Sequence, residues 1–321
     1  MIRFEQAVES DTPALVALWN QSFGPQWPLT ERLLRQTLSD PWHEAPGHLV
    51  ARESERVVGW VLCKSMKQAG ELPRFQGRGG IGALCVHPDF RRQKIATQLL
   101  DGAESWLQSQ GATPGTLYFP HHLLPGIPAD CEAAIALFRA RGYEGFNPCV
   151  DLWRALDDYQ MPDKARAAIQ ANPDVELRPA RAQESEALIE MVEREFPGGW
   201  PYSTRGHFKR GGAPTDIIVA SEHGAIIGFC HTADWRSGWL LPSVYWHQLL
   251  GENYGGLGPI GIARAHRKRG LGLALCARAV EALKERGVTR MAIDWTTLVA
   301  FYEQMGFKVW KRYLQASKPA S

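Results

Sequence analysis

Two segments of the chain place cationic side chains at the start of an expected helix, directly after an apolar strand. They are HPDFRRQKIATQLL, from His87, and RAHRKRGLGLALC, from Arg264. A helix N-terminus already carries about half a positive charge, so cations at that end are unfavourable unless an anion binds there. Free backbone N–H groups, with close approach allowed by Gly270 and Gly272, can hold a pyrophosphate. The spacing therefore indicates two anion sites, and a solvated basic helix start is the alternative for each.

The second segment resembles the central motif of the GNAT superfamily of acyl-CoA-dependent N-acetyltransferases, which reads Q/R-x-x-G-x-G/A after a strand. Arg267, Gly270 and Gly272 match this motif in full. The resemblance implies that the chain binds acetyl-CoA as a co-substrate, without a metal. It also implies that an acceptor amine attacks the thioester directly, with no covalent enzyme intermediate.

The first segment matches the same motif only in part. Arg91 and Ala96 agree with it, whereas Lys94 stands where the family has glycine. A side chain at this position crowds a bound pyrophosphate, although its ammonium group can also pair with the phosphates. The coenzyme-binding residues implied by the resemblance are Val86, Arg91, Arg92, Gln93, Lys94 and Ala96 in the first copy, and Ile260, Gly261, Ile262, Arg267, Lys268, Arg269, Gly270, Leu271 and Gly272 in the second.

A short helix with a glycine-aromatic end, at 137–143 and again at 301–307, is a second point of resemblance. In the family, a tyrosine four residues before this glycine returns a proton to the departing thiolate. That position is Tyr302 in the second copy and Phe138 in the first, and phenylalanine has no proton to give. The alternative for Tyr302 is an aromatic residue packed on an amphipathic helix.

Deprotonation of the acceptor amine requires a base, because a protonated amine cannot attack. The position along the chain points to Glu252 as the candidate base, with His247 and Asp294 as alternatives. Each of the three can equally be a structural hydrogen-bonding residue. The resemblance further implies that a backbone N–H near Ile260 polarises the thioester carbonyl.

The elements that position these residues occur twice. FEQAVESDTPALVAL from Phe4 corresponds to LRPARAQESEALIEM from Leu177, and each passes from a strand into an amphipathic helix. The offsets between the copies drift slowly, which indicates two homologous domains with different loops rather than a short-period solenoid. We expect an α/β (α+β layered) fold of two tandem GNAT-like domains, each a mixed central sheet flanked by helices.

The expected domain boundaries follow from the length and from a change of pattern. A chain of 321 residues suits two domains. Strand patterns give way to polar, helix-forming residues at 156–174, which we interpret as a linker between domains at 1–155 and 175–321. The strand TLYF, at 116–119, is expected after the helix that ends at Gly111.

Composition excludes several classes of protein. With 45% hydrophobic and 22% charged residues the chain is an ordinary globular protein, and a net charge of +2 argues against a nucleic-acid binder. No apolar window is long enough for a membrane span, and the start lacks the apolar core of a signal peptide, so we expect a cytoplasmic protein. The six cysteines form no C-x-x-C pair and the ten histidines show no metal spacing, which predicts reduced thiols and no metal site.

These observations predict an N-acetyltransferase that acts on a primary amine of a small molecule, with the second domain catalytic. The tandem layout is similar to that of the mycothiol synthase type within the family. Aromatic residues at 233–258 suit a flat, sugar-like or apolar acceptor, although domain packing explains them equally well. The alternative from another class is a non-catalytic acetyl-CoA sensor or scaffold. The oligomeric state is left open.

Overall fold

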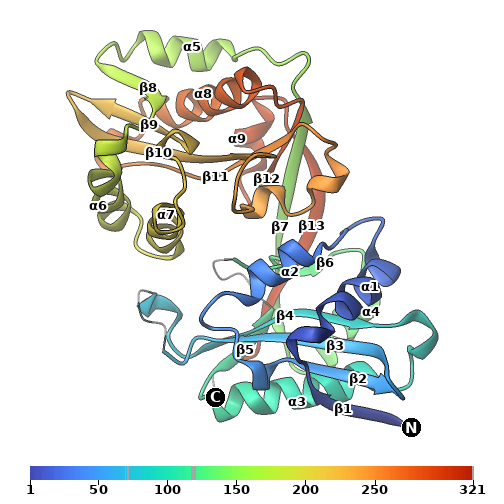
Figure 1. The fold of residues 1–321 in the computed structure, drawn as a ribbon. Coiled ribbons are helices and arrows are strands. Elements are labelled where there is room, and N and C mark those ends of the chain that lie inside the picture. The colour runs from blue at the N-terminus through green and yellow to red at the C-terminus, as the bar shows by residue number, and fades with distance from the viewer. Residues whose placement is uncertain (69, 71, 117–120, 320–321) are drawn as a thin grey trace. The chain divides into compact units, whose positions relative to one another are not determined.

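The computed structural model describes residues 1–68, 70, 72–116 and 121–319. The chain forms two compact units (Figure 1). The N-terminal unit contains Met1–Cys149 and also the end of the chain, Arg312–Ser321, and the C-terminal unit contains Val150–Lys311. Each unit has its own set of strands and its own core.

The sheet of the N-terminal unit is antiparallel except for one central parallel pair. In spatial order its strands are β1 (Ile2–Gln6), β2 (Leu49–Glu53), β3 (Arg56–Ser65), β4 (Arg78–Val86), β5 (Thr113–Thr116) and the last part of β13 (Lys308–Ser317). Strands β4 and β5 form the parallel pair. The short strand β6 (Ile127–Pro128) also pairs with β13.

Helices cover both faces of this sheet. Successive residues of a strand point to opposite faces, and on β3 Val61 packs against helix α3 (Ile95–Ser109) while Trp60 contacts Trp19 of helix α1 (Thr12–Phe23). Helix α2 (Glu31–Leu38) begins after Thr30, whose hydroxyl accepts the Leu33 N–H at 3.1 Å. Helix α4 (Glu132–Ala140) completes the unit.

The C-terminal unit repeats this arrangement. In spatial order its strands are β8 (Val175–Pro179), β9 (Ile217–Glu222), β10 (Ala225–Asp234), β11 (Tyr254–Ile262), β12 (Arg290–Thr296) and the last part of β7 (Glu144–Ala155). Strands β11 and β12 form its parallel pair. Its helices are α5 (Asp163–Gln170), α6 (Ser185–Glu195), α7 (Gly199–Lys209), α8 (Leu271–Glu285) and α9 (Val299–Glu303).

Helix α8 is the most deeply buried helix of the C-terminal unit, because the sheet covers one side and α5 packs on another. Leu275, Cys276 and Val280 are fully buried in the core that α8 forms with the sheet. The Tyr159 hydroxyl donates to the carbonyl of Ala277 at 3.2 Å, which fixes the chain just before α5 onto α8. The segment 156–174 therefore contains a helix that belongs to the C-terminal unit.

The repeated order of strands and helices confirms the expected α/β fold with two tandem copies. The expected strand at 116–119 meets β5 only at Thr116, and residues 117–119 lie outside the described residues. No helix within the described ranges is long and apolar enough to cross a membrane.

Candidate functional site

Strands β11 and β12 separate in the middle of the C-terminal unit's sheet. Their parallel pairing ends at Leu257 and Ile293, and β11 continues along β10 alone as far as Ile262. Residues 254–257 are buried, whereas 258–261 are only half-buried. Over this segment the backbone N–H and C=O groups of β11 that face β12 are no longer paired with that strand. Because backbone donors and acceptors need partners, a ligand can pair with them.

A loop of unpaired backbone donors follows β11. Lys268 and Gly270 have positive φ angles of 64° and 77°, and α8 begins at Leu271. Among the described residues, no backbone carbonyl accepts a hydrogen bond from the N–H groups of Lys268 to Leu273. Amides at a helix start, together with the helix dipole, form an anion site. We call residues 268–273 the second cradle.

The cations of this loop have different roles. Arg269 forms an ion pair with Glu222 at 2.7 Å and donates to the side chain of Asn172 at 2.9 Å. Arg267 donates to the carbonyl of Ile262 at 2.9 Å, so it connects the loop to the end of β11. Lys268 is exposed. Arg267 and Arg269 therefore hold the loop in place, and the backbone amides and Lys268 remain for an anion.

Gly270 is constrained by the neighbouring helix as well as by its own φ angle. A Cβ atom built on Gly270 lies 2.7 Å from the Cβ of Ala168 on α5. Asn172, just after α5, also donates to the carbonyl of Arg269 at 3.2 Å. Helix α5 therefore supports the second cradle from the side.

The first residue of β12 beyond the paired region is Asp294. Its Oδ1 atom lies 3.4 Å from the position that a Cβ on Gly258 would occupy, so the carboxyl faces the separated part of β11. Burial and the nearby charge of Asp151 raise the pKa of Asp294 to about 8. Asp151 lies on β7 and accepts the N–H of Trp295 at 2.9 Å. A carboxyl with this pKa can exchange protons near neutral pH.

Tyr302 lies on the short helix α9 and is 5% exposed. Its ring contacts those of Phe301 and Phe307. Burial, followed by the nearby Cys276, Cys230 and Asp294, raises the pKa of Tyr302 above its usual range. The hydroxyl therefore keeps its proton. Tyr302 belongs to the same buried core as Cys276 of α8.

The other two candidate bases lie elsewhere. Glu252 is exposed and lies before β11, six residues ahead of Gly258, which corresponds to about 20 Å along an extended chain. His247 stacks on Tyr254, at the start of β11, with ring centroids 4.5 Å apart. The structure thus brings Asp294, and not Glu252 or His247, to the separation of the strands.

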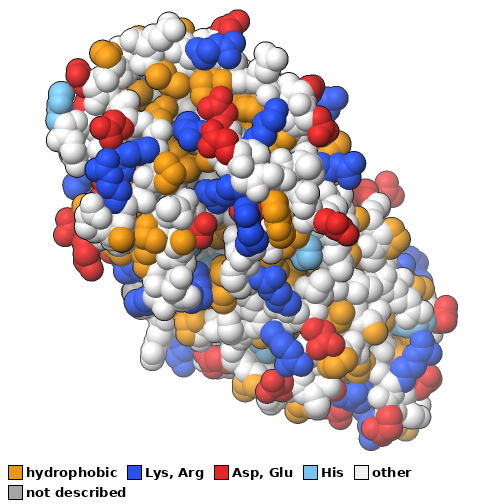
Figure 2. Space-filling model, turned by 45° about the horizontal axis from the view of Figure 1, so that its top comes forward, with side chains coloured by type: hydrophobic (Ala, Val, Ile, Leu, Met, Phe, Trp, Pro, Cys, Tyr) orange, Lys and Arg blue, Asp and Glu red, His pale blue; other side chains and the backbone are white. Residues whose placement is uncertain are grey.

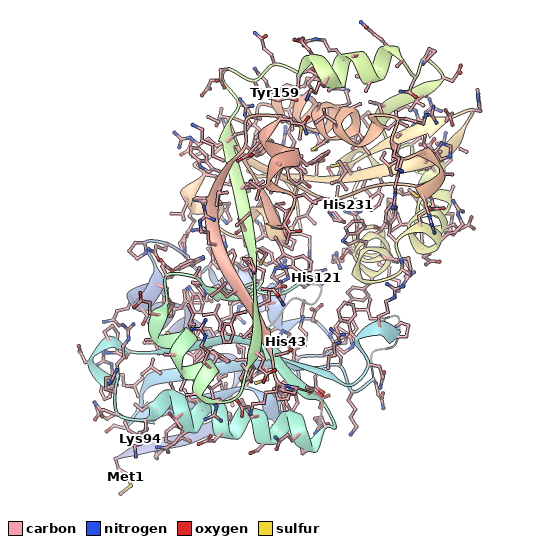
Figure 3. All side chains as sticks on the ribbon, turned by 180° about the vertical axis from the view of Figure 1, so that it is seen from behind. Met1, His43, Lys94, His121, Tyr159 and His231 are labelled. Atoms are coloured by element: carbon pink, nitrogen blue, oxygen red, sulfur yellow. The ribbon has the colours of Figure 1, made fainter. Side chains whose placement is uncertain are left out.

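The N-terminal unit contains a loop of the same backbone geometry. Arg92 and Lys94 have φ angles of 64° and 63°, and Lys94 directly precedes α3 (Figure 3). Arg91 donates to the carbonyl of Val86 at 3.3 Å, as Arg267 does to the carbonyl of Ile262. Within the described residues, no backbone carbonyl accepts the N–H groups of residues 92–97, which we call the first cradle.

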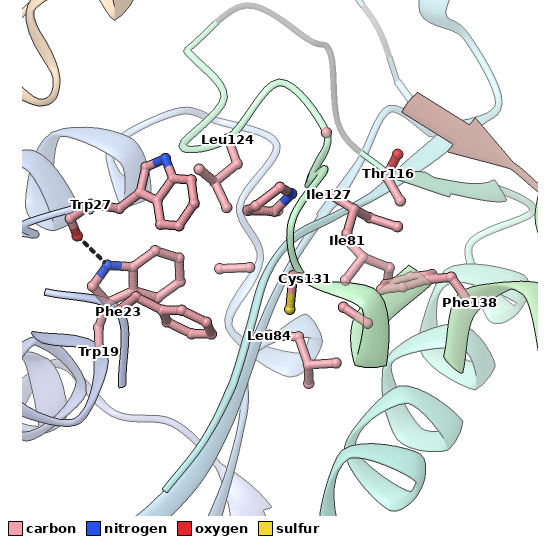
Figure 4. A pocket seen from close by; sticks show the side chains of 15 residues that line it. Trp19, Phe23, Trp27, Ile81, Leu84, Thr116, Leu124, Ile127, Cys131 and Phe138 are labelled. Carbon is pink, nitrogen blue, oxygen red and sulfur yellow. Dashed lines mark hydrogen bonds between the residues drawn. The ribbon is translucent and has the colours of Figure 1, made fainter. Parts of the chain in front are cut away.

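The corresponding part of the N-terminal unit, beside β4, is apolar. Strands β4 and β5 pair from Arg78 to Ile81 and from Thr113 to Thr116, which is the last described residue of β5. A pocket of about 70 Å³ opens beside the next residues of β4 (Figure 4). Phe138, in the position of Tyr302, is buried against Tyr143. The pocket is lined by Trp19, Phe23, Trp27, Ile81, Gly82, Ala83, Leu84, Thr116, Leu124, Gly126, Ile127, Pro128, Cys131, Ala134 and Phe138.

Aromatic side chains adjoin the separated part of β11 in the C-terminal unit. A Cβ on Gly261 would lie 2.5 Å from the Phe196 ring, so that ring rests directly on the strand. Trp200 lies 5.2 Å from Phe196 between ring centroids and is 36% exposed. By contrast, Tyr245 and Trp246, from the aromatic segment 233–258, are buried. Trp200 is therefore more accessible than Tyr245 and Trp246.

Surface charge is mixed on the face in Figure 2, where Lys and Arg are interspersed with Asp and Glu. Nucleic-acid binders usually present a broad basic surface, and this face does not present one. In the part of the chain that the structure describes, no group of three or more His, Cys, Asp or Glu side chains could hold a metal ion.

Curated relatives of known name match most of the chain. It is 24% identical to the mycothiol acetyltransferase of Pseudarthrobacter chlorophenolicus, over 73% of this chain and 68% of that protein. It is 23% identical to the mycothiol acetyltransferase of Corynebacterium glutamicum, over 82% of this chain and 78% of that protein.

Solved structures share the tandem architecture. A GCN5-related glucosamine N-acetyltransferase region of a fungal multi-domain GH3 β-N-acetylglucosaminidase superposes with a TM-score of 0.89 and 27% identity, over 99% of this chain. This chain spans only 38% of that longer protein. A tandem GNAT protein from the clavulanic acid biosynthesis pathway superposes with a TM-score of 0.66 and 16% identity, over the whole of both chains.

A family profile matches both halves of the chain. The profile described as the acetyltransferase (GNAT) family covers residues 12–143 and 185–307. The matches include the separation of β11 and β12, the pocket beside β4 and the two cradles described above. The chain is therefore a tandem member of the GNAT family of acetyltransferases.

Proposed function

We propose that this protein transfers the acetyl group of acetyl-CoA to the primary amine of an amino sugar, and that the C-terminal unit carries out the reaction. The observation that carries the proposal is the placement of the Asp294 carboxyl against Gly258, where β11 and β12 separate. The names of the relatives support the acceptor class, since mycothiol acetyltransferases and a glucosamine N-acetyltransferase region are both among them.

The second cradle fits a coenzyme pyrophosphate, because its amides are unpaired and a Cβ on Gly272 would meet no atom closer than 4.0 Å. In this proposal the pyrophosphate binds residues 268–273, with Arg267 and Arg269 fixing the loop. The pantetheine lies along the open edge of β11 at Ile260, Gly261 and Ile262. Acetyl-CoA supplies the activated thioester. By the same reasoning Val86, Arg91, Arg92, Gln93, Lys94 and Ala96 hold a second coenzyme in the N-terminal unit.

Asp294 acts as the general base in this mechanism. Its pKa of about 8 is close to that of a sugar ammonium group, so a proton passes from the amine to the carboxylate with little free-energy cost. The neutral amine then attacks the thioester carbonyl, whose developing negative charge is stabilised by a backbone N–H of β11. Tyr302, whose hydroxyl stays protonated, gives its proton to the thiolate as the C–S bond breaks. The phenolate that remains takes the surplus proton from the nitrogen, which becomes the amide.

The acceptor binds against the exposed ring of Trp200 in this proposal. An aromatic face packs well against the C–H surface of a sugar ring, and Phe196 holds Trp200 next to β11. Substituting Trp200 by alanine is expected to raise the KM for the amine about tenfold, with a smaller effect on the KM for acetyl-CoA.

The test is release of coenzyme A thiol from acetyl-CoA with glucosamine as the acceptor. Tyr302→Phe is expected to lower kcat by about 100-fold, the usual range for loss of a general acid. Tyr159→Phe is the matched control, because it removes a buried tyrosine hydroxyl that donates to Ala277 rather than to the site. Glu252→Gln tests the other candidate base, and we expect it to leave kcat unchanged.

The non-catalytic sensor remains the competing function. It predicts that acetyl-CoA binds in calorimetry while no amino sugar in a panel becomes acetylated. It also predicts that Tyr302→Phe changes neither affinity nor thiol release. Acetylated glucosamine detected by mass spectrometry, and lost in Tyr302→Phe, excludes the sensor.

A further inference from the structure

We propose that the apolar pocket of the N-terminal unit binds the acyl group of an acyl-CoA, and that this acyl group is a short hydrocarbon chain longer than acetyl. The unit holds this thioester and does not transfer it. The inference rests on the proposed coenzyme site at the first cradle, and it adds the identity of the acyl group and the absence of transfer.

The pocket lies where an acyl group of a bound coenzyme belongs. Gly82, Ala83 and Leu84, which line it, belong to β4. The first cradle begins shortly after the same strand ends. The pocket and the cradle thus lie along one strand and its continuation, as Gly258 and the second cradle do along β11 in the C-terminal unit.

The wall of the pocket presents hydrocarbon, because its polar groups are used inside the protein. The Trp19 indole N–H donates to the carbonyl of Trp27 at 2.6 Å, and the Trp27 indole N–H donates to the hydroxyl of Tyr313 at 3.3 Å. The Thr116 hydroxyl donates to the carbonyl of Ala316 at 3.2 Å and accepts its N–H at 2.8 Å.

The arrangement of the side chains is visible in Figure 4. Trp19, Phe23 and Trp27 stand on one side and Ile127 and Phe138 on the other. A sugar amine would lose its hydrogen bonds with water in such a pocket, whereas a hydrocarbon chain loses none. The ligand class that fits is therefore an alkyl group.

The volume sets the length of that group. A pocket of about 70 Å³ has roughly half the volume of an apolar cavity of about 150 Å³ that binds benzene, so it holds roughly three carbon groups. The acetyl methyl leaves part of this space unfilled, and a butyryl chain fills it. Each added methylene is expected to increase affinity about three- to fourfold, so the two additional methylenes of butyryl-CoA should make it bind roughly tenfold more tightly than acetyl-CoA.

The described lining of the pocket contains no carboxyl, imidazole or phenol group. Cys131 is the one ionisable side chain among these lining residues, and Phe138 stands in the position of Tyr302. Within the described lining an amine therefore finds neither the carboxyl base nor the tyrosine acid that we propose for the C-terminal unit.

Cys131 provides a site-specific reporter in the intact protein. Its thiol belongs to the pocket and is half-buried, whereas the other five cysteines are buried. The protein is treated with iodoacetamide in the presence of acetyl-CoA, propionyl-CoA or butyryl-CoA. The alkylated fraction of the Cys131 peptide is then read by mass spectrometry. We expect butyryl-CoA to protect Cys131 at a concentration roughly tenfold below that needed for acetyl-CoA.

A pair of variants on α4 isolates the contribution of the pocket. Ala134→Leu fills the pocket, and Ala133→Leu adds the same side chain at an exposed neighbouring position. Ala134→Leu should abolish the preference for butyryl-CoA, and Ala133→Leu should keep it. Thermal unfolding of both variants shows whether the fold is retained, and the wild-type comparison of thioesters requires no variant.

Three outcomes separate this inference from the proposed function. Equal protection by all thioesters overturns the acyl preference and leaves the coenzyme site intact. Absence of protection by any thioester overturns the N-terminal coenzyme site as well. Thiol release from butyryl-CoA with glucosamine that persists in an Asp294→Asn, Tyr302→Phe double variant overturns the claim that the N-terminal unit does not transfer.

Discussion

At the scale of single residues, the proposed chemistry depends on one carboxyl whose pKa is far from its ordinary value. Asp294 is the first residue of β12 that no longer pairs with β11, and it shares its surroundings with the carboxyl of Asp151. Glu252 was the base that the sequence favoured. It is exposed and lies two residues before the start of β11.

Substituting Asp294 by asparagine removes the base but keeps the size of the side chain. We expect kcat to fall by about 100-fold or more. Only the carboxylate can accept a proton, so the kcat of the wild-type protein should rise as the pH increases to about 8 and then level off. The asparagine variant should lack this rise. The measurement is kcat by thiol release from about pH 6 to about pH 9.

Asp151→Asn is the companion variant for this prediction. It removes a neighbouring negative charge that helps to raise the pKa of Asp294, so the midpoint of the pH dependence should move to lower pH. An Asp294→Asn variant that keeps both the rate and the pH dependence of the wild type would identify another group as the base.

At the scale of elements, the sequence predicted the two cradles and the helices that follow them, because glycine and arginine at fixed spacing are local signals. It could not show that Gly270 also lies against Ala168, since α5 is about a hundred residues earlier in the chain. For the same reason the sequence could not show that Asp151 lies near Asp294, because Asp151 belongs to β7. Contacts of this kind depend on how distant segments pack, which no local pattern contains.

The contact between α5 and the second cradle predicts the effect of a small substitution. Gly270→Ala brings a methyl group 2.7 Å from Ala168 and places alanine at a φ of 77°, so it should destabilise the C-terminal unit by about 1–3 kcal/mol. Adding Ala168→Gly should recover part of this loss. The measurement is the free energy of unfolding in urea.

The first cradle offers the reverse experiment. Lys94 is a non-glycine residue at a φ of 63°, so Lys94→Gly relieves backbone strain at the equivalent position. We expect it to leave stability unchanged or to raise it by up to about 1 kcal/mol. If Gly270→Ala and Lys94→Gly shifted stability in the same direction, the left-handed geometry would not be the cause.

Strands β2 and β3 of the N-terminal unit adjoin a buried group of titratable residues. His48 has its pKa lowered to about 4 by burial, and its ring accepts the backbone N–H of Cys63 at 3.4 Å. The pKa of His43 is also lowered by burial. Nearby, Asp40 contacts Lys64 and His121, each at 2.7 Å, and these partners outweigh the burial that would raise its pKa, lowering it to about 2.

These shifts predict how the stability of the N-terminal unit depends on pH. Unfolded histidine takes up a proton below about pH 6.5, whereas folded His48 stays neutral down to about pH 4. Stability should therefore be complete above about pH 6.5 and decrease as the pH falls toward 4. Asp40 adds its own loss only below about pH 4. Hydrogen exchange of β2 and β3 measures this, and His48→Asn should flatten the dependence.

At the scale of the whole molecule, each unit is completed by a segment from outside its own half of the sequence. The N-terminal unit takes residues 312–321 from the end of the chain, and the C-terminal unit takes residues 150–155. Sequence repeats predicted two domains, but the repeats alone do not reveal which copy a terminal strand joins. Tyr313 is fully buried, and Ala316 forms two hydrogen bonds with Thr116.

This arrangement predicts that residues 1–155 do not fold alone. A fragment ending there lacks the part of β13 that pairs with β5 and β6, and it leaves the indole N–H of Trp27 without the Tyr313 hydroxyl. Loss of a fully buried tyrosine costs about 3–5 kcal/mol, a large part of a typical domain's stability. We expect the fragment to show no cooperative thermal transition, and a synthetic peptide of residues 310–319 to restore one. A cooperative transition in the fragment without the peptide would mean that the N-terminal unit needs only its own half of the sequence.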